Sequence, residues 1–306
     1  MKRVFYVLAV VIIALLLSVY LFIPGQLKVQ EADSINAALP AVSRVLLKEE
    51  NWQKWWPGET LLSLDDTKFS VTKKMLNSFE IMIEQNGDSL KSVLQFSQFK
   101  QYSINLIWNC TVVSGINPFQ RIAGYFKARR IKNKLNTLTD SLHIFLSNQK
   151  NIYGFEIKKV LVTDSILIST RKTFDHYPSA IETEALIDNL RKYISANKAK
   201  EMNYPMLHVR ELTYNQFEAM VAIATDVKLP DNNEFASKQL LKGGNLLEAE
   251  ITGGHTSIRN FIMEYENFVR DFSISSPAIP YQLIITDRAK ESDTSKWVTK
   301  LCYPVF

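Results

Sequence analysis

Two stretches in the second half of this chain repeat the same order of elements 75 residues apart. That shift places Ile187 on Ile262, Tyr193 on Phe268 and Pro205 on Pro280. Each copy is predicted to be a strand, an amphipathic helix and two further strands. Neither copy can bury a one-sided sheet by itself, so we expect the two to pack pseudo-symmetrically with a groove between them.

The boundaries of the two copies follow from their hydrophobic patterns. The first is predicted to comprise strands 156–162 and 166–172, a helix over 181–197, and strands 206–211 and 219–224. The second is predicted to comprise a strand over 245–252, a helix over 257–272, and strands 281–287 and 296–306.

The last fifty or so residues carry the clearest motif of the chain. A Gly253-Gly254 turn precedes the second helix, Pro280 leads the next strand, and the chain closes with Trp297, Thr299 and Pro304 in the spacing Trp-x-Thr-x-x-x-x-Pro. Together with the repeat, this order resembles the GyrI-like (AraC-type effector-binding) domain over residues 152–306. The resemblance implies two βαββ modules that hold a small molecule in the cleft between them.

The same resemblance implies where a ligand would be contacted. Family members often carry a glutamate in the cleft floor at the position of Gln282, and an amide there has no charge to offer a cation. We therefore expect a small hydrophobic or aromatic ligand. Trp297 either lines the cleft or fills the core between sheet and helix. Tyr204 and His208 of the first copy either line the opposite side of the cleft or have a surface or core role.

The first half has a different order. A strand, a short helix, a tryptophan turn, four strand-like runs and one long helix are predicted over residues 27–149. Asn86-Gly87 indicates a hairpin, and Asn117-Pro118 indicates the start of the long helix. This order resembles the START-like (SRPBCC) helix-grip domain, in which an antiparallel sheet wraps a long carboxyl-terminal helix around a cavity. The residues that carry the resemblance are Ser34-Ile35-Asn36-Ala37-Ala38, Val42, Val45, Asn51, Trp52 and Trp55.

The tryptophan turn holds Trp52, Trp55 and Trp56 before Pro57-Gly58. In a helix-grip domain such a turn mainly pins the short helix to the sheet. We expect packing for all three, with Trp55 as the candidate for lining a pocket.

The amino terminus begins with an uncharged run from Val4 to Ile23. As a helix it would rise about 30 Å, the thickness of a bilayer core. The run lacks a small-x-small cleavage site, so an uncleaved transmembrane anchor is predicted over residues 1–26. Lys2 and Arg3 precede the run, which predicts a single-pass protein of a bacterial inner membrane with its amino terminus inside and its domains in the periplasm.

The remaining sequence patterns mainly exclude classes of function. The net charge of +5 does not call for nucleic acid, and none is predicted as a partner. Residues 117–139 contain six cations and no acidic residue, which favours a solvated basic helix face or a helix lying toward an anionic membrane. The four histidines lack metal-ligand spacing, and hydrolase and nucleotide motifs are missing from the sequence. We therefore predict no catalytic residue, metal or cofactor.

The sequence thus predicts an α+β protein with a transmembrane helix (1–26), a helix-grip domain (27–149) and a GyrI-like domain (152–306). Its expected function is non-enzymatic binding or sensing of a small ligand at a membrane. Two alternatives stay open: a hydrolase of a small reactive molecule with Glu250 or Glu266 as base, and a protein-interaction module. Cys110 and Cys302, without a CxxC motif, are expected to be buried thiols. The sequence decides neither the ligand's identity nor the oligomeric state.

Overall fold

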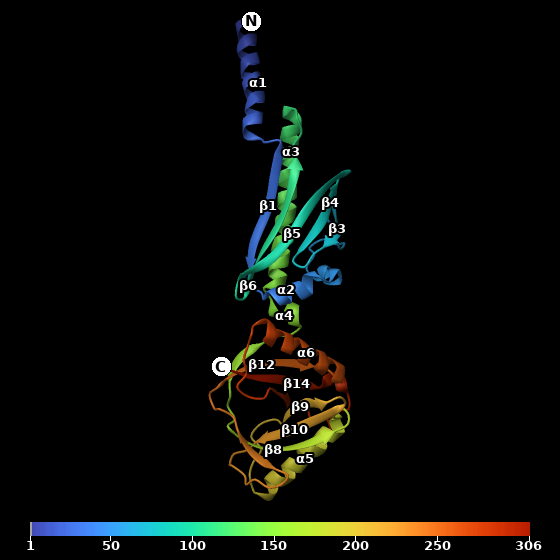
Figure 1. The fold of residues 1–306 in the computed structure, drawn as a ribbon, viewed down its shortest axis with the longest axis vertical. Helices are drawn as coiled ribbons and strands as arrows, with labels where there is room; N and C mark the ends of the chain where they lie inside the picture. The colour runs from blue at the N-terminus through green and yellow to red at the C-terminus, as the bar shows by residue number, and fades with distance from the viewer. Residues whose placement is uncertain (1) are drawn as a thin grey trace. The chain divides into compact units, whose positions relative to one another are not determined.

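A computed structural model describes residues 2–306 (Figure 1), with only the backbone described for residues 2–5 and 9. The chain divides into two compact units, Met1–Ile152 and Tyr153–Phe306. Each is an α+β unit built on one antiparallel sheet. The first contains α1 (Lys2–Phe22), β1 (Gln26–Ile35), α2 (Leu39–Leu46), the 3-10 helix η1 (Glu49–Lys54), β2 (Ser63–Leu64), β3 (Thr67–Lys74), β4 (Ser78–Gln85), β5 (Asp88–Lys100), β6 (Ser103–Val113) and α3 (Pro118–Leu146).

The second unit follows α4 (Gln149–Tyr153), which crosses the boundary. It contains β7 (Lys158–Leu161), β8 (Ile166–Phe174), α5 (Ala180–Ala196), β9 (Met206–Thr213), β10 (Gln216–Ala224), β11 (Ala236–Gln239), β12 (Asn245–Thr252), α6 (His255–Asp271), β13 (Tyr281–Ile284), η2 (Thr294–Lys296) and β14 (Val298–Val305).

The sheet of the first unit has the order β1-β6-β5-β4-β3-β2, and the long helix α3 packs along it (Figure 1). The helix begins where the sequence predicts, because the Asn117 side chain accepts a hydrogen bond from the backbone nitrogen of Gln120 at 2.8 Å and Pro118 occupies the first turn. Its buried side chains recur every three or four residues, as one face of a helix requires. They include Ala128, Ile131, Leu135, Leu138 and Leu142.

Aromatic side chains fill the core of this unit. The rings of Trp52 and Trp56 stack with centroids 6.2 Å apart, and Phe79 meets Trp52 edge-on at 5.3 Å. The indole nitrogen of Trp52 donates to the carbonyl of Leu46 at 2.8 Å, at the end of α2. All three tryptophans of the turn, Trp55 included, are buried. They therefore pack the short helix against the sheet, while the START-like resemblance itself stays a prediction.

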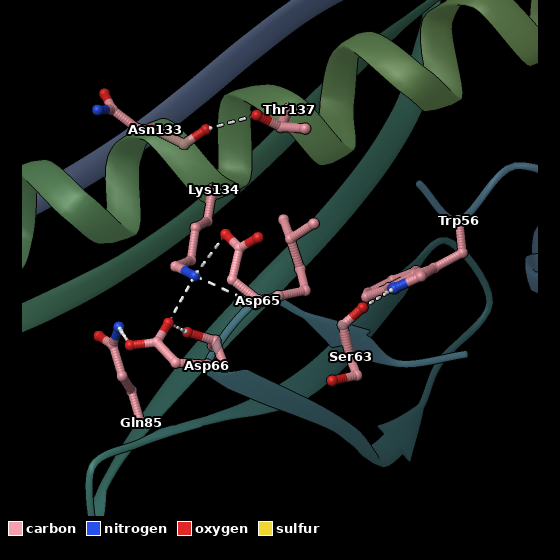
Figure 2. A network of polar contacts seen from close by, with 10 residues as sticks. Trp56, Ser63, Asp65, Asp66, Gln85, Asn133, Lys134 and Thr137 are labelled. Carbon is pink, nitrogen blue, oxygen red and sulfur yellow. Dashed lines mark hydrogen bonds and ion pairs between the residues drawn. The ribbon is translucent and has the colours of Figure 1, made fainter. Parts of the chain in front are cut away.

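A polar network fastens the middle of α3 to the edge of the sheet (Figure 2). The Lys134 ammonium lies 2.8 Å from a carboxylate oxygen of Asp66 and 3.0 Å from one of Asp65, between β2 and β3. It also donates to the carbonyl of Leu64 at 3.1 Å. Gln85 of β4 donates to the other oxygen of Asp66 at 2.8 Å. Lys134 and Gln85 thus both donate to Asp66, whose carboxylate joins α3, the β2–β3 turn and β4.

The prediction of a membrane anchor is corrected by the structure. In the part of the chain that the structure describes, no helix is both long and apolar enough to cross a bilayer. The transmembrane helix in the predicted fold class and the single-pass, extracytoplasmic localisation are therefore both wrong. The side chains of Lys2 and Arg3, which set the predicted orientation, lie outside the described residues.

The carboxyl end of α1 is instead tied to α3. The Arg121 guanidinium lies 4.5 Å from the ring centre of Tyr20 and donates to the carbonyl of Ile23 at 2.7 Å. Ser114, at the end of β6, donates to the carbonyl of Pro24 at 2.6 Å. Gly124 lets α3 approach this corner, since a Cβ there would stand 2.5 Å from the Cα of Ser114. Polar contacts thus hold the junction between α1 and β1.

The sheet of the second unit has the order β11-β8-β10-β9-β13-β14-β12-β7. The first copy of the repeat forms β8, α5, β9 and β10, and the second forms β12, α6, β13 and β14. Within each copy the last strand lies between the other two, and the copies join where β9 pairs with β13. The core beneath α5 unites Leu190 and Ile194 of the helix with Val221 and Ile223 of β10. The helices thus cover one face of the sheet and leave the other to the candidate site.

Several strands of the second unit differ from their predicted bounds, and β7 and β11 show why. The predicted strand over 156–162 is paired only over Lys158–Leu161, at the sheet edge beside β12. The short strand β11 is not predicted at all, since its four residues show no alternation, and it pairs with β8. Pairing with a partner distant in sequence, rather than local pattern, creates both elements.

Candidate functional site

Three neighbouring strands of the second unit present their side chains alternately to the two faces of the sheet. Met220 of β10 lies directly opposite Arg171 of β8 on one side and His208 of β9 on the other. In the next row of the same face, Ala222 lies between Ser169 and Met206. The residues between these rows belong to the core beneath α5. The two rows therefore lie on the face that the helices leave open.

A pocket of about 440 Å³ lies on this face, and we refer to it as the strand pocket. Its size falls within the range of small-molecule sites. Most of its lining is apolar, with charged groups around it. The lining consists of Leu167, Ser169, Arg171, Met206, His208, Arg210, Glu218, Met220, Ala222, Lys238, Gln239, Leu240, Ala278, Ile279 and Tyr281.

One carboxylate and one guanidinium of the strand pocket form a close pair. In Arg210 both Nε and one terminal nitrogen approach the same oxygen of Glu218, at 2.9 and 2.8 Å. Arg171 contributes a longer approach of 3.9 Å to the other oxygen of Glu218. Because Glu218 is already held by Arg210, it is a poor candidate for a free general base.

His208 links the floor of the strand pocket to its wall. Its Nδ1 lies 2.8 Å from the carbonyl oxygen of Pro280. Burial lowers the pKa of His208, and the nearby positive charge of Arg210 lowers it further. The ring is therefore neutral at pH 7, with Nδ1 donating to Pro280 and Nε2 left as an acceptor.

Tyr281 lines the strand pocket and contacts a neutral thiol on the neighbouring strand. Tyr281 of β13 pairs with Cys302 of β14, and the tyrosine side chain hydrogen-bonds the cysteine sulfur. Burial raises the pKa of Tyr281 and raises that of Cys302 to about 12. Both keep their protons at neutral pH, so Cys302 offers no thiolate nucleophile.

A second pocket of about 460 Å³ lies beside α5, and we refer to it as the helix-side pocket. Arg191 in its wall lies 3.2 Å from Glu184 and 3.1 Å from Glu201. Burial raises the pKa of Glu184, with Asp287 adding to the effect. Three carboxylates against one guanidinium make this pocket negative, whereas the strand pocket is positive.

The structure separates the four residues predicted to contact ligand. His208 lines the strand pocket, and the half-exposed Tyr204 lines the helix-side pocket. Gln282 is paired with Leu207, which belongs to the core beneath α5, and directly paired residues share a face. The buried amide of Gln282 therefore faces the helix layer rather than the strand pocket. Its role in binding stays a prediction, as do those of Tyr204 and His208.

Trp297 lies immediately before β14 and is buried. Its indole nitrogen donates to the carbonyl of Glu291 at 2.9 Å. The guanidinium of Arg288 lies 5.0 Å from its ring centre, and the His255 ring meets it edge-on at 5.0 Å. The indole ring is thus contacted by Arg288 and His255 of the same unit. Its predicted role as a ligand wall stays untested.

The carboxylates named for a hydrolase lie elsewhere. Glu250, on β12, is half exposed and lies 3.9 Å from the ammonium of Lys300, while Glu266 is exposed on α6. Neither lines either of the two pockets described here. Among the described residues, no three His, Cys, Asp or Glu side chains gather to hold a metal ion.

Sequence reasoning missed Arg171, Glu218, Met220 and Lys238. Alternation in β8 and β10 carried a usable signal for the first three, because Leu167, Ser169 and Arg171 share a face, as do Glu218, Met220 and Ala222. No sequence signal pointed to Lys238, since β11 is recognisable only from its pairing with β8.

Comparison with known proteins yields partial structural similarities. No family model matches the chain, and no curated protein matches it. The structure of the EcmrR–DNA complex aligns with 61% of this chain and 69% of its own, at 14% identity and a TM-score of 0.44. The EcmrR carboxyl-terminal domain aligns over 50% and 98%, at 14% identity and a TM-score of 0.42. SAV2435 bound to tetraphenylphosphonium aligns over 49% and 94%, at 12% identity and a TM-score of 0.33. These matches fit the predicted GyrI-like resemblance and carry no further argument.

Proposed function

We propose that the second unit binds a small, largely apolar molecule in the strand pocket. The observation that carries the proposal is the face of β8, β9 and β10 that lines the strand pocket. There Leu167, Met206 and Ala222 are buried in an apolar cluster that holds no helix residue among those described. The opposite face of the same strands is covered by α5. An apolar concavity with a few polar groups at its border is the usual form of a small-molecule site.

The expected affinity is modest. A ligand that buries about 200 Å² of apolar surface gains about 5 kcal/mol at ~25 cal/mol per Å², before the entropic cost of association. That corresponds to a dissociation constant of about 0.2 mM at best, and a weaker one once the entropic cost is subtracted. Tighter binding requires directional contacts, and His208 Nε2 and the cations at the border supply candidates for them.

The test is a fluorescence titration of the full chain with N-phenyl-1-naphthylamine, an uncharged dye that brightens in apolar surroundings. Met220→Trp and Ala278→Trp each place a larger side chain at the pocket, one at its floor and one at its exposed wall. Each is expected to weaken the saturable binding about tenfold or more. Met263→Trp, on the exposed part of α6, is the matched control and is expected to leave binding unchanged.

Binding that survives in both pocket variants is background from other apolar surfaces. If the saturable component is missing in the wild type, or persists in Met220→Trp and Ala278→Trp while both remain folded, the strand pocket is not the binding site.

A further inference from the structure

The charges that line the strand pocket are unequal. Arg171, Arg210 and Lys238 face one carboxylate, Glu218. Because Arg210 and Glu218 neutralise one another at 2.8 Å, two positive charges remain beside an apolar floor. The half-buried His208 adds none at neutral pH, since burial lowers its pKa.

Neither remaining cation is strongly engaged within the protein. Arg171 lies 3.9 Å from Glu218, with 73% of its side chain exposed. Lys238 is exposed and makes no ion pair with any residue that the structure describes. Exposed pairs at such distances contribute little, so both side chains are available to an incoming group.

Both cations also border a neighbouring hollow. That hollow is lined by residues 232–236 and shares Ser169, Arg171, Met220 and Lys238 with the strand pocket. It adds one exposed carboxylate, Glu234. Lys238 lies opposite Leu167 on β8, four residues before Arg171. The two cations therefore occupy positions about 13 Å apart along β8, at ~3.3 Å per residue, and both line the shared border.

We infer that the ligand is an amphiphilic anion, with an apolar body on the floor of the strand pocket and an anionic head beside Arg171 and Lys238. This inference rests on the proposed function, since it names the ligand class of the same pocket. It adds a negative charge to the hydrophobic or aromatic ligand expected from Gln282, whose amide faces the helix layer. A cation would meet repulsion at this border, because two positive charges lie there without a close partner.

The experiment compares three ligands with the same ten-carbon chain: decanoate, 1-decanol and decyltrimethylammonium. Each displaces N-phenyl-1-naphthylamine from the component of binding that Met220→Trp removes. We expect decanoate to compete at least about tenfold better than decanol, and decyltrimethylammonium to compete worst. The advantage of decanoate should fall as ionic strength rises from about 0.01 M to about 1 M, since the Debye length shrinks from about 30 Å to about 3 Å.

Arg171 and Lys238 are exposed, so replacing them is expected to leave the fold intact. Arg171→Ala with Lys238→Ala should cost decanoate about tenfold in affinity, because each exposed charge contributes modestly, and should leave decanol unchanged. Lys192→Ala, on the exposed face of α5, is the control and should change neither.

The outcomes separate the two claims. If the dye fails to bind, the proposed function fails. If the dye binds but decanol or decyltrimethylammonium matches decanoate, the strand pocket does not prefer an anion. If the double variant keeps full decanoate affinity, Arg171 and Lys238 do not bind the anionic head, and the inference is overturned.

Discussion

The Nδ1 atom of His208 lies 2.8 Å from the carbonyl oxygen of Pro280. That oxygen can only accept, so Nδ1 carries a proton and donates it. The hydrogen bond ties the middle of β9 to the segment before β13, where Ala278 and Ile279 wall the strand pocket. One titratable ring therefore holds the floor and the wall of the pocket together.

Stability of the second unit should depend on the charge state of His208. Burial, with Arg210, lowers its pKa in the folded protein. As pH falls below about 6.5 the unfolded chain takes up the proton first, so stability is lost until the lower folded pKa is passed. His208→Gln keeps a donor for Pro280 without titrating. Urea unfolding is monitored through hydrogen exchange in peptides of the second unit. Between pH 8 and pH 5 the wild type should lose more stability than the variant. Parallel pH profiles would contradict the assignment.

The network around Lys134 should make the first unit sensitive to acid. The hydrogen bond from Lys134, followed by that from Gln85, lowers the pKa of Asp66 to about 2. Its contribution to stability is present above the ordinary value of 3.8 and is lost as pH falls toward about 2. Asp66→Asn should therefore lower the melting temperature at pH 7 and flatten its fall in acid.

Tryptophan fluorescence can follow this transition, because four of the five tryptophans lie in the first unit. Glu59→Gln removes an exposed carboxyl outside the network and is the control. Equal effects of the two variants would show that the network is not the cause.

Trp297→Phe distinguishes a structural ring from a ligand wall. The substitution removes the hydrogen bond to Glu291 and weakens the contact with Arg288, which should cost about 1 to 2 kcal/mol of stability. Because Trp297 does not line the strand pocket, dye affinity should stay within about twofold of the wild type. A tenfold loss of affinity in the folded variant would instead place Trp297 in the binding site.

The two thiols should be unreactive in the native protein. Cys110 and Cys302 are free and buried, as the sequence predicts, and burial raises their pKa values to about 11 and about 12. At pH 8 the thiolate fraction is therefore small and shielded. A colourimetric thiol assay should detect no rapid reaction in the native chain and two thiols in denaturant. Rapid labelling of either cysteine without denaturant would mean that its unit opens locally.

Local chemistry made much of the fold readable. Asn117 and Pro118 mark the start of α3 because a side-chain acceptor and a fixed φ are properties of those residues alone. The 75-residue repeat likewise locates α5 and α6, since buried residues such as Leu190 and Tyr265 recur at the same place in each copy. Hydrophobic periodicity and helix capping depend on residues within a few positions of one another. They can therefore be recognised without knowing which surface the helix packs against.

The site depended on contacts that no local pattern contains. Alternation indicates that Met206 and His208 share a face, but only the packing of α5 on Val221 and Ile223 decides which face stays open. The same parity turns Gln282 toward the helices, although the family resemblance places it in a cleft. Lys238 reaches the pocket because β11 pairs with a strand nearly seventy residues earlier. The sequence by itself thus determined the elements and their repeat, while burial and charge at the pocket were decided by tertiary pairing, because a side chain's surroundings are set by residues distant along the chain.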